Sequence, residues 1–167
     1  AKAIQRMENS RRAFLAGGSL DQEAREMLSL TGKEAEQAAR DTGLGSLVFA
    51  LKPGDGSARE QAASCQRVLG GCANVAAEYA TKRYRSNVVN WGMLPFIMKD
   101  AAASPLQVGD KLLLMGIKGA LEQGGEHICA TLIRNGERRE IVLELPAITK
   151  DERDILLAGC LINYYAE

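Results

Sequence analysis

The stretch PGDGSARE, residues 53–60, places a hydroxyl and a guanidinium directly after a glycine-rich turn. It follows the apolar run SLVFALK, which is short and bounded by glycine and proline, as expected for a buried strand. A helix is predicted to follow from about Ala58 to Leu69. Free N–H groups at a helix N-terminus attract anions, and glycines let the backbone come close to a ligand. Ser57 and Arg59 therefore suggest a small anion-binding site.

Arg59 is unusual because a cation in the first turn of a helix opposes the helix dipole. A carboxylate ligand would explain it, through a bidentate pair with the guanidinium. The plainer interpretation is that residues 54–56 only make a turn, that Ser57 caps the helix and that Arg59 is a solvated charge. The residues alone leave both interpretations open.

A second polar cluster, KRYRSN, contains Arg85, Ser86 and Asn87 and precedes Trp91. Basic residues beside aromatic ones can contact RNA. However, Lys+Arg and Asp+Glu both number 21, so the formal net charge is zero, which argues against nucleic-acid or membrane binding by bulk charge. We favour a bracing role, in which Arg85 and Asn87 bond loop carbonyls and support the turn at residues 53–60.

The composition describes a globular protein. The chain has 167 residues, of which 46% are apolar, enough for one domain with a core, alone or with an appendage. No apolar run approaches the roughly 20 residues of a membrane span. The chain opens with Ala1 and shows no secretory signal, so we expect the cut end of a longer polypeptide, although a separate small subunit stays open.

The cysteines do not suggest a metal site within this chain. They make no CxxC pair, and His127, to which we assign no role, is the single histidine. Cys65 and Cys160 fall on predicted apolar helical faces, where cysteine behaves as a small hydrophobe. We expect reduced cysteines and a cytoplasmic protein. The four cysteines are Cys65, Cys72, Cys129 and Cys160.

Residues 1–45 predict three short helices with thin apolar faces. The first ends at a glycine pair, and capping boxes are expected at Ser19 with Gln22 and at Thr31 with Glu34. Because so little of these helices can be buried, we expect an arm or connector that packs on another part of the protein.

Residues 46–167 predict alternating strands and helices. After the first strand and helix come a strand near Val75, a helical turn and a core strand or loop at NVVNWGMLPFIM. KLLLMGI is a strand, GIKGALEQGGE a strand end and loop, and HICATLIR with REIVLEL a hairpin around NGE. A capping box at Thr149 and Glu152 begins the last helix. The helical turn carries Tyr79, Arg83 and Tyr84, and Ile155, Leu156, Gly159 and Ile162 share one face of the last helix.

Three sequence motifs, in a fixed order along the chain, resemble those of a known enzyme family. The chain resembles the C-terminal swivel domain of the aconitase family of hydro-lyases, which includes the isopropylmalate isomerase small subunit. That family carries a Gly-Ser-Ser-Arg-acidic motif, an Arg-Ser-Asn-apolar-Gly-apolar-Leu-Pro motif and a final Gly-Gly-apolar-Leu-Asn-Tyr helix. The counterparts are Gly56, Ser57, Ala58, Arg59 and Glu60; then Arg85, Ser86, Asn87, Gly92, Leu94 and Pro95; then Gly159, Leu161, Asn163 and Tyr164.

The resemblance implies a fold and an activity. The fold would be α/β, a swivelling three-layer β/β/α domain at 46–167 preceded by the helical arm at 1–45. The whole enzyme would remove and re-add water on a hydroxy-polycarboxylate, with an iron–sulfur cluster on other domains as Lewis acid and none in this chain. Those domains, in the same polypeptide or a large subunit, would be its partners. Ser57 would be the general base, Arg59 with Gly56 would bind substrate, and Arg85 and Asn87 would support them.

The chain also departs from the family pattern. Ala58 stands where the family has a second serine, and the family's Asp-His loop and substrate-binding arginine segment are not visible upstream. An alternative is therefore a degenerate, non-catalytic binding or interaction module that has kept the fold.

Overall fold

A six-stranded mixed sheet organises the fold in the computed structural model, which describes residues 2–145 and 148–166. The strand order is β1-β2-β3-β6-β5-β4. The first three strands are parallel, and the other three are antiparallel. The two halves meet where Ile97 pairs with Glu144. The strands are β1 Ser46–Ala50, β2 Gly71–Ala76, β3 Leu94–Ile97, β4 Lys111–Leu114, β5 His127–Arg134 and β6 Glu137–Glu144.

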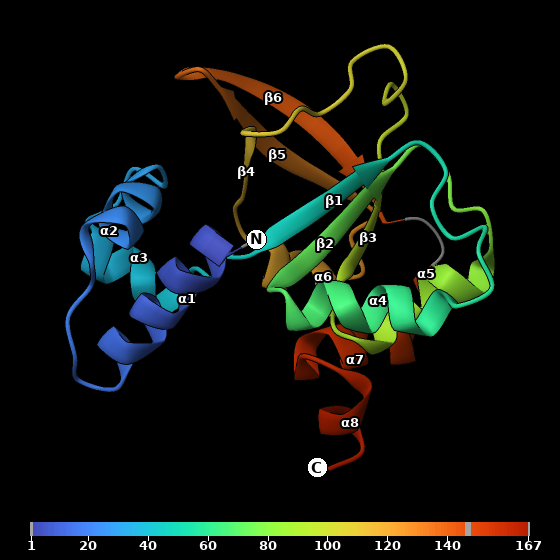
Figure 1. The fold of residues 1–167 in the computed structure, drawn as a ribbon, viewed down its shortest axis with the longest axis horizontal. Coiled ribbons are helices and arrows are strands. Elements are labelled where there is room, and N and C mark those ends of the chain that lie inside the picture. Colours follow the sequence, from blue (N-terminus) through green and yellow to red (C-terminus); the bar gives the residue numbers. More distant parts are fainter. Residues whose placement is uncertain (1, 146–147, 167) are drawn as a thin grey trace.

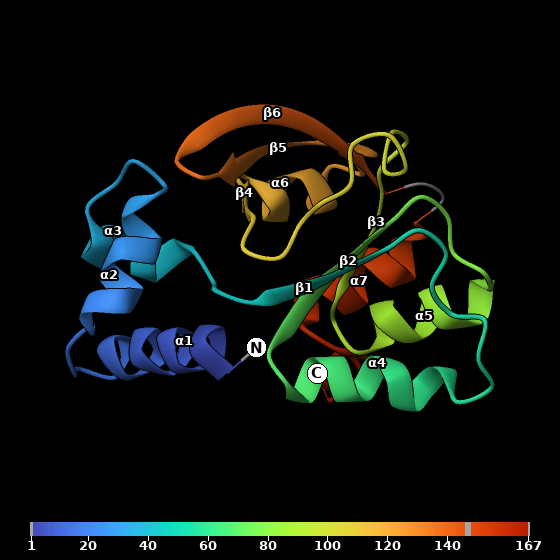
Figure 2. The ribbon, with the colours of Figure 1, turned by 45° about the horizontal axis from the view of Figure 1, so that its top comes forward.

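The two halves of the sheet and one layer of helices form three layers. Figure 2 shows β5 and β6 arching over β1–β3, with helices α4 (Arg59–Val68), α5 (Lys82–Asn90) and α7 (Lys150–Ala158) on the opposite side of β1–β3. Buried Val75, Phe96 and Leu143 belong to the core that joins the layers. This arrangement confirms the α/β fold with β/β/α layers.

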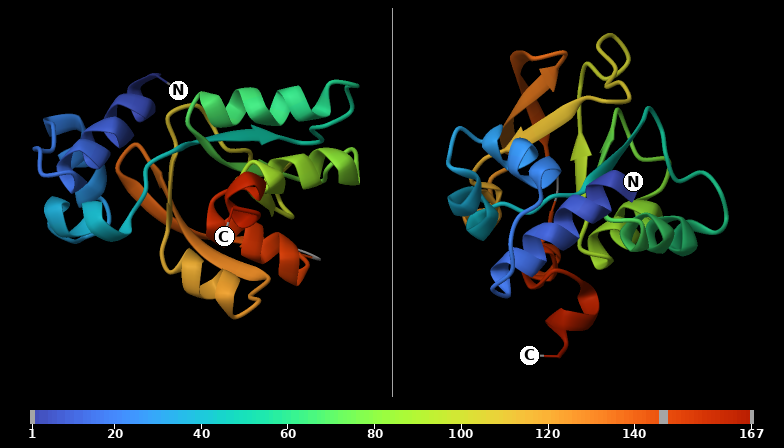
Figure 3. Two further views of the ribbon diagram at one scale, coloured as in Figure 1. Left: turned by 90° about the horizontal axis from the view of Figure 1, so that it is seen from below. Right: turned by 60° about the vertical axis from the view of Figure 1, so that its left-hand side comes forward.

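The N-terminal helices bury a core of their own, contrary to expectation. Helices α1 (Lys2–Leu15), α2 (Gln22–Ser29) and α3 (Ala35–Asp41) pack together beside the sheet (Figures 1 and 3). Their alanines allow close helix contacts that the thin apolar faces did not indicate. Hydrogen bonds connect these helices to the rest of the chain: Arg138 donates to the Leu30 carbonyl, and Gln5 donates to the Val68 carbonyl. The buried residues are Met7, Leu20, Ala24, Leu28, Ala35, Ala38 and Ala39.

Two of the three predicted capping boxes are wrong. Asp21, not Ser19, caps α2, and its carboxylate accepts from the Ala24 N–H at 2.7 Å. The Thr31 hydroxyl instead donates to the Leu28 carbonyl at the end of α2, and α3 begins without a side-chain cap. The box of Thr149 with Glu152 is confirmed, because both of its reciprocal bonds are present.

Several predicted faces meet solvent. Strand β1 is an edge strand and is only partly buried, because it pairs with β2 alone. On α4 the predicted apolar face that carries Cys65 is exposed, as are Ala62 and Leu69, and Ala63 faces the core. Hydrophobic periodicity locates the apolar face of a helix, but it does not say which side of that helix another element covers.

The four cysteines are free: Cys65 and Cys129 are exposed, and Cys72 and Cys160 are half-buried.

Helix boundaries also differ from the predictions. The segment NVVNWGMLPFIM begins as the last turn of α5 and becomes β3 only at Leu94, while Tyr79 lies before the helix. Two short helices, α6 (Ile117–Glu122) and α8 (Leu161–Tyr164), complete the fold, and α6 lies where a loop was expected. Gly159 ends α7 with φ 92°, so Ile162 lies outside that helix and is exposed. No helix in the described ranges is long and apolar enough to cross a membrane.

Glu8 ties the N-terminal helices to the segment before β1. Its carboxylate accepts two bonds of 2.8 Å from Arg11 and one of 2.9 Å from the Leu44 N–H. Arg11 also donates to the Ala39 carbonyl at 2.7 Å. Burial raises the pKa of Glu8, but the bonds from Arg11 and Leu44 outweigh it, so the pKa is lowered from 4.5. The ionised form therefore stabilises the folded chain.

We expect Glu8→Gln to lower the free energy of unfolding at pH 7 by about 1–3 kcal/mol. Because the folded pKa lies below the unfolded value, this stabilisation is present above pH 4.5 and is lost as the pH falls through the folded pKa. Urea unfolding of both proteins between pH 3 and 7 measures it. Glu23→Gln, at an exposed carboxylate 3.8 Å from Arg6, is the control and should change stability by less than about 0.5 kcal/mol. A loss for Glu8→Gln that is independent of pH would contradict the prediction.

Candidate active site at the Gly54–Arg59 turn

The turn begins at the carboxyl end of β1, the end of a parallel strand at which α/β folds bind ligands. Gly54 has φ 99°, and a Cβ there would lie 2.5–2.7 Å from Tyr84 side-chain atoms. Only glycine therefore fits between the turn and α5. The Ala80 N–H donates to the Pro53 carbonyl at 2.9 Å and fastens the two segments together.

Ser57 does not cap the following helix. Helix α4 begins at Arg59, its N-cap is Ala58, and no side chain bonds the N-terminal amides. Ser57 is exposed, and its hydroxyl has no hydrogen-bond partner within residues 2–145 and 148–166. The interpretation of Ser57 as a helix cap is therefore wrong, and both its hydroxyl and the α4 amides are available to a ligand.

Arg59 is half-buried and points back to its own turn. Its Nε–H donates to the Gly54 carbonyl at 3.1 Å. Across the part of the chain that the structure describes, it has no carboxylate partner. A solvated first-turn cation would not need this bond, whereas a guanidinium fixed at one edge can still pair with an anion at the other.

These residues surround a surface hollow of about 390 Å³. Tyr84, which sequence reasoning did not assign to the site, is 3% exposed, and its Oη accepts bonds from Asn74 at 2.9 Å and Gln66 at 3.3 Å. No local signal identifies Tyr84, because its place depends on the packing of α5 under the turn. The lining residues are Gly54, Gly56, Ser57, Ala58, Arg59, Ala62 and Tyr84.

Arg85 and Asn87 lie on α5 and not in a loop, and neither lines the hollow. Arg85 pairs with both oxygens of Glu152, at 3.0 and 3.3 Å. Glu152 also closes the capping box of α7, so Arg85 braces α5 against that helix. The Asn87 side chain makes no hydrogen bond within the described ranges.

The second and third motifs meet at two glycines. A Cβ on Gly92, which has φ 70°, would lie 1.6 Å from the Gly159 carbonyl oxygen. Asn163 donates to the Ala158 carbonyl at 2.9 Å and closes the end of α7. Thus α7 is fixed to α5 at both ends.

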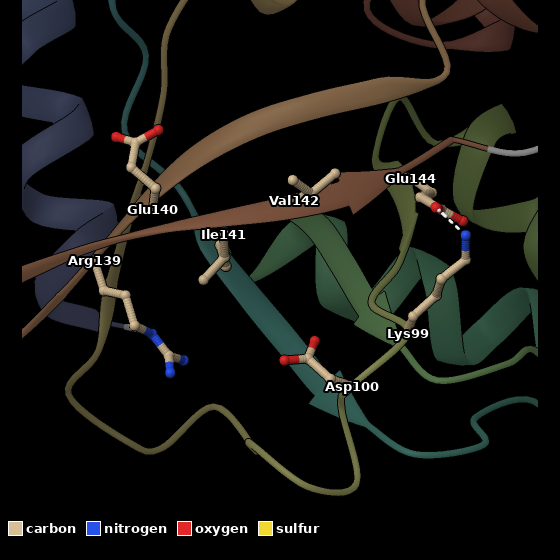
Figure 4. A pocket seen from close by; sticks show the side chains of 7 residues that line it. All are labelled: Lys99, Asp100, Arg139, Glu140, Ile141, Val142 and Glu144. Carbon is tan, nitrogen blue, oxygen red and sulfur yellow. Dashed lines mark ion pairs between the residues drawn. The ribbon is translucent and has the colours of Figure 1, made fainter.

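A second hollow of about 350 Å³ lies beside β6 (Figure 4). Its two basic residues have partners: Lys99 pairs with Glu144 at 2.7 Å, and Arg139 donates to Ser104 at 2.9 Å. Three of its lining side chains are acidic and two are basic, so it is less suited to an anionic ligand than the turn. Its lining residues are Lys99, Asp100, Arg139, Glu140, Ile141, Val142 and Glu144.

Comparison with known proteins agrees with the motifs. Residues 21–101 match the family described as the Aconitase C-terminal domain. The chain is 28% identical over 138 residues to "Aconitate hydratase A" of Rickettsia bellii, covering 80% of this chain and 16% of that protein. It is 30% identical over 117 residues to "Putative aconitate hydratase, mitochondrial" of Aspergillus fumigatus, covering 68% and 14%.

Residues 21–101 belong to the aconitase C-terminal domain family. The match to the aconitase domain includes the Gly54–Arg59 turn and the motif from Arg85 to Pro95, whereas Gly159 and Asn163 lie beyond it. It begins at residue 21 and so also includes α2 and α3. The aligned region spans only 14–16% of the length of these two curated relatives.

Proposed function

We propose that this chain is the C-terminal domain of an aconitase-like hydratase, which removes and re-adds water on a hydroxy-polycarboxylate. One observation carries the proposal: an unpartnered Ser57 hydroxyl and the open edge of Arg59 line one hollow at the uncapped start of α4. The family match and the names of the relatives, both aconitate hydratases, support the same reaction class.

Arg59 and Gly56 would bind the substrate. With its Nε–H given to the Gly54 carbonyl, Arg59 presents its two terminal nitrogens to a substrate carboxylate. A Cβ at Gly56 would meet no atom within 4 Å, so the backbone there lies in open space and a ligand can approach it. The N-terminal amides of α4 add further donors for the same carboxylate.

Ser57 would act as the general base. As an alkoxide, its Oγ accepts the proton from the carbon next to the bound carboxylate. The electron pair of that C–H bond becomes the carbon–carbon double bond as hydroxide leaves the neighbouring carbon. The alkoxide is stabilised by the charge of Arg59 and the free amides of α4, which favour the ionised form.

An iron–sulfur cluster does not fit the described part of this chain. Residues 2–145 and 148–166 contain no group of three or more His, Cys, Asp or Glu side chains that could hold a metal ion. We therefore assign the cluster to other domains of the same polypeptide or to a large subunit, which would also complete the substrate site. In this proposal residues 46–167 form the swivel domain, and residues 1–45 connect it to its partners.

A non-catalytic module that keeps the fold is the second candidate. The observation that favours it is Ala58, which leaves the start of α4 without the hydroxyl that the family has there. Three cluster cysteines in the neighbouring sequence of the full-length protein would favour the hydratase, and their loss would favour the module.

The proposed activity is tested in the full-length protein with all its domains, by following the hydration of aconitate. We expect turnover in the wild type, and a KM about 10- to 100-fold higher for Arg59→Lys, because lysine cannot make the forked pair. Arg67→Lys, near the other end of α4, is the matched control and should leave KM unchanged. Absence of turnover in a cluster-loaded protein, or an unchanged KM for Arg59→Lys, would contradict the proposal.

A further inference from the structure

Arg59 does not hold its position alone, because its acceptor is shared. The Gly54 carbonyl accepts from Arg59 Nε at 3.1 Å and from the Thr81 hydroxyl at 3.2 Å. Thr81 is 27 residues from Gly54 in sequence, so this second bond comes from another part of the fold. The carbonyl that directs the guanidinium is thus itself fixed by Thr81.

Thr81 is well placed to hold this carbonyl because its own conformation is fixed. It is the N-cap of α5, with φ −144° and ψ 145°, and its Oγ1 accepts the Tyr84 N–H at 3.2 Å. Because Oγ1 accepts the Tyr84 N–H through a lone pair, its hydroxyl hydrogen remains to donate to the Gly54 carbonyl. The Tyr84 side chain packs against Gly54 on the same side of the turn, so a Cβ at Gly54 would have no room.

We infer that Thr81 is a positioning residue, which orients Arg59 through the Gly54 carbonyl so that only its terminal nitrogens face the hollow. A guanidinium held by Nε binds a carboxylate end-on, through Nη1 and Nη2, and not side-on through Nε. The identity of the ligand as a carboxylate rests on the proposed function, whereas the positioning itself does not.

Loss of the Thr81 hydroxyl tests the inference in the 167-residue chain. We expect Thr81→Val to accelerate exchange of the Arg59 Nε–H with water about tenfold, measured by NMR, because the shared carbonyl loses one of its two anchors. Thr81→Ser, which keeps the hydroxyl, should restore slow exchange. The Arg59 Nε–H resonance is assigned as the one that is missing from the spectrum of the Arg59→Lys chain.

A matched control separates positioning from helix capping. Thr149→Val removes an N-cap bond of the same kind from α7, where the cap accepts the Glu152 N–H at 3.2 Å. It should leave exchange at Arg59 unchanged. Exchange at Arg59 that is equally fast in both valine variants, or unchanged by Thr81→Val, would overturn the inference.

Kinetics in the full-length protein add a second readout. We expect Thr81→Val to raise KM for aconitate about tenfold with kcat changed less than about threefold, and Thr81→Ser to behave as wild type. If the wild type turns over no aconitate while Thr81→Val still accelerates exchange at Arg59, the proposed function fails and the positioning role stands. If kcat falls and KM does not change, Thr81 does not act through carboxylate binding.

Discussion

Replacing Ser57 by alanine in the full-length protein is expected to lower kcat for aconitate hydration by about 10²- to 10⁴-fold. The reason is that Ser57, the proposed base in dehydration, is by microscopic reversibility the group that returns the proton to carbon in hydration. Its hydroxyl has no structural partner to lose among the described residues. KM should change by less than about threefold, since Arg59 and the α4 amides still bind the carboxylate. Steady-state kinetics over a range of aconitate concentrations separates the two constants.

The control for this change lies on the same helix. Ser64→Ala removes a hydroxyl that donates to the Gln61 carbonyl at 3.1 Å within α4. It should leave both constants within about twofold of the wild type, because a surface change of this kind has little effect. A Ser57→Ala protein with wild-type kcat would end the assignment of the general base.

Replacing Gly92 by alanine is expected to lower the free energy of unfolding by more than about 4 kcal/mol. The new Cβ would lie 1.6 Å from the Gly159 carbonyl oxygen, at a φ of 70° that alanine rarely adopts. Backbone, and not a flexible side chain, is the obstacle, so α5 and α7 would have to separate. That movement would open the core around Ile155 and Leu156.

Urea unfolding of the 167-residue chain measures this loss. The control is Gly119→Ala within α6, where a Cβ would meet nothing within 4 Å. Alanine is the better helix former, so this variant should match or exceed the wild type by up to about 1 kcal/mol. Equal unfolding midpoints for Gly92→Ala and the wild type would show that the two glycines do not meet as described.

The sequence predicted those elements whose signals are local. The NGE hairpin formed because Asn135 and Gly136 adopt positive φ, 51° and 84°, as a two-residue turn requires. The α7 capping box also depends on four consecutive residues. By contrast, the burial of the N-terminal helices and the exposed face of Cys65 depend on which element packs where, and periodicity does not contain that information.

The same distinction applies to the site. Ser57 and Arg59 could be named because motif and turn are contiguous in sequence, although their roles remain a proposal. Tyr84 and Thr81 could not, since they reach the turn only when α5 packs beneath it. Arg85 was expected to support the turn, whereas it pairs with Glu152 and braces α5 against α7, because that contact depends on how the two helices pack.

The central claim, that the Gly54–Arg59 turn binds a carboxylate ligand, is tested most directly by titrating the ¹⁵N-labelled chain with tricarballylate. If the ligand carboxylate pairs with Arg59 and accepts a few hydrogen bonds from backbone amides, the chemical shifts of Ser57 and Arg59 should change and saturate, with a Kd of roughly 1 mM or weaker. These shifts should vanish in Arg59→Lys, while signals from the Lys99 and Arg139 hollow stay unmoved. Shifts confined to that second hollow, or none at the turn, would contradict the account.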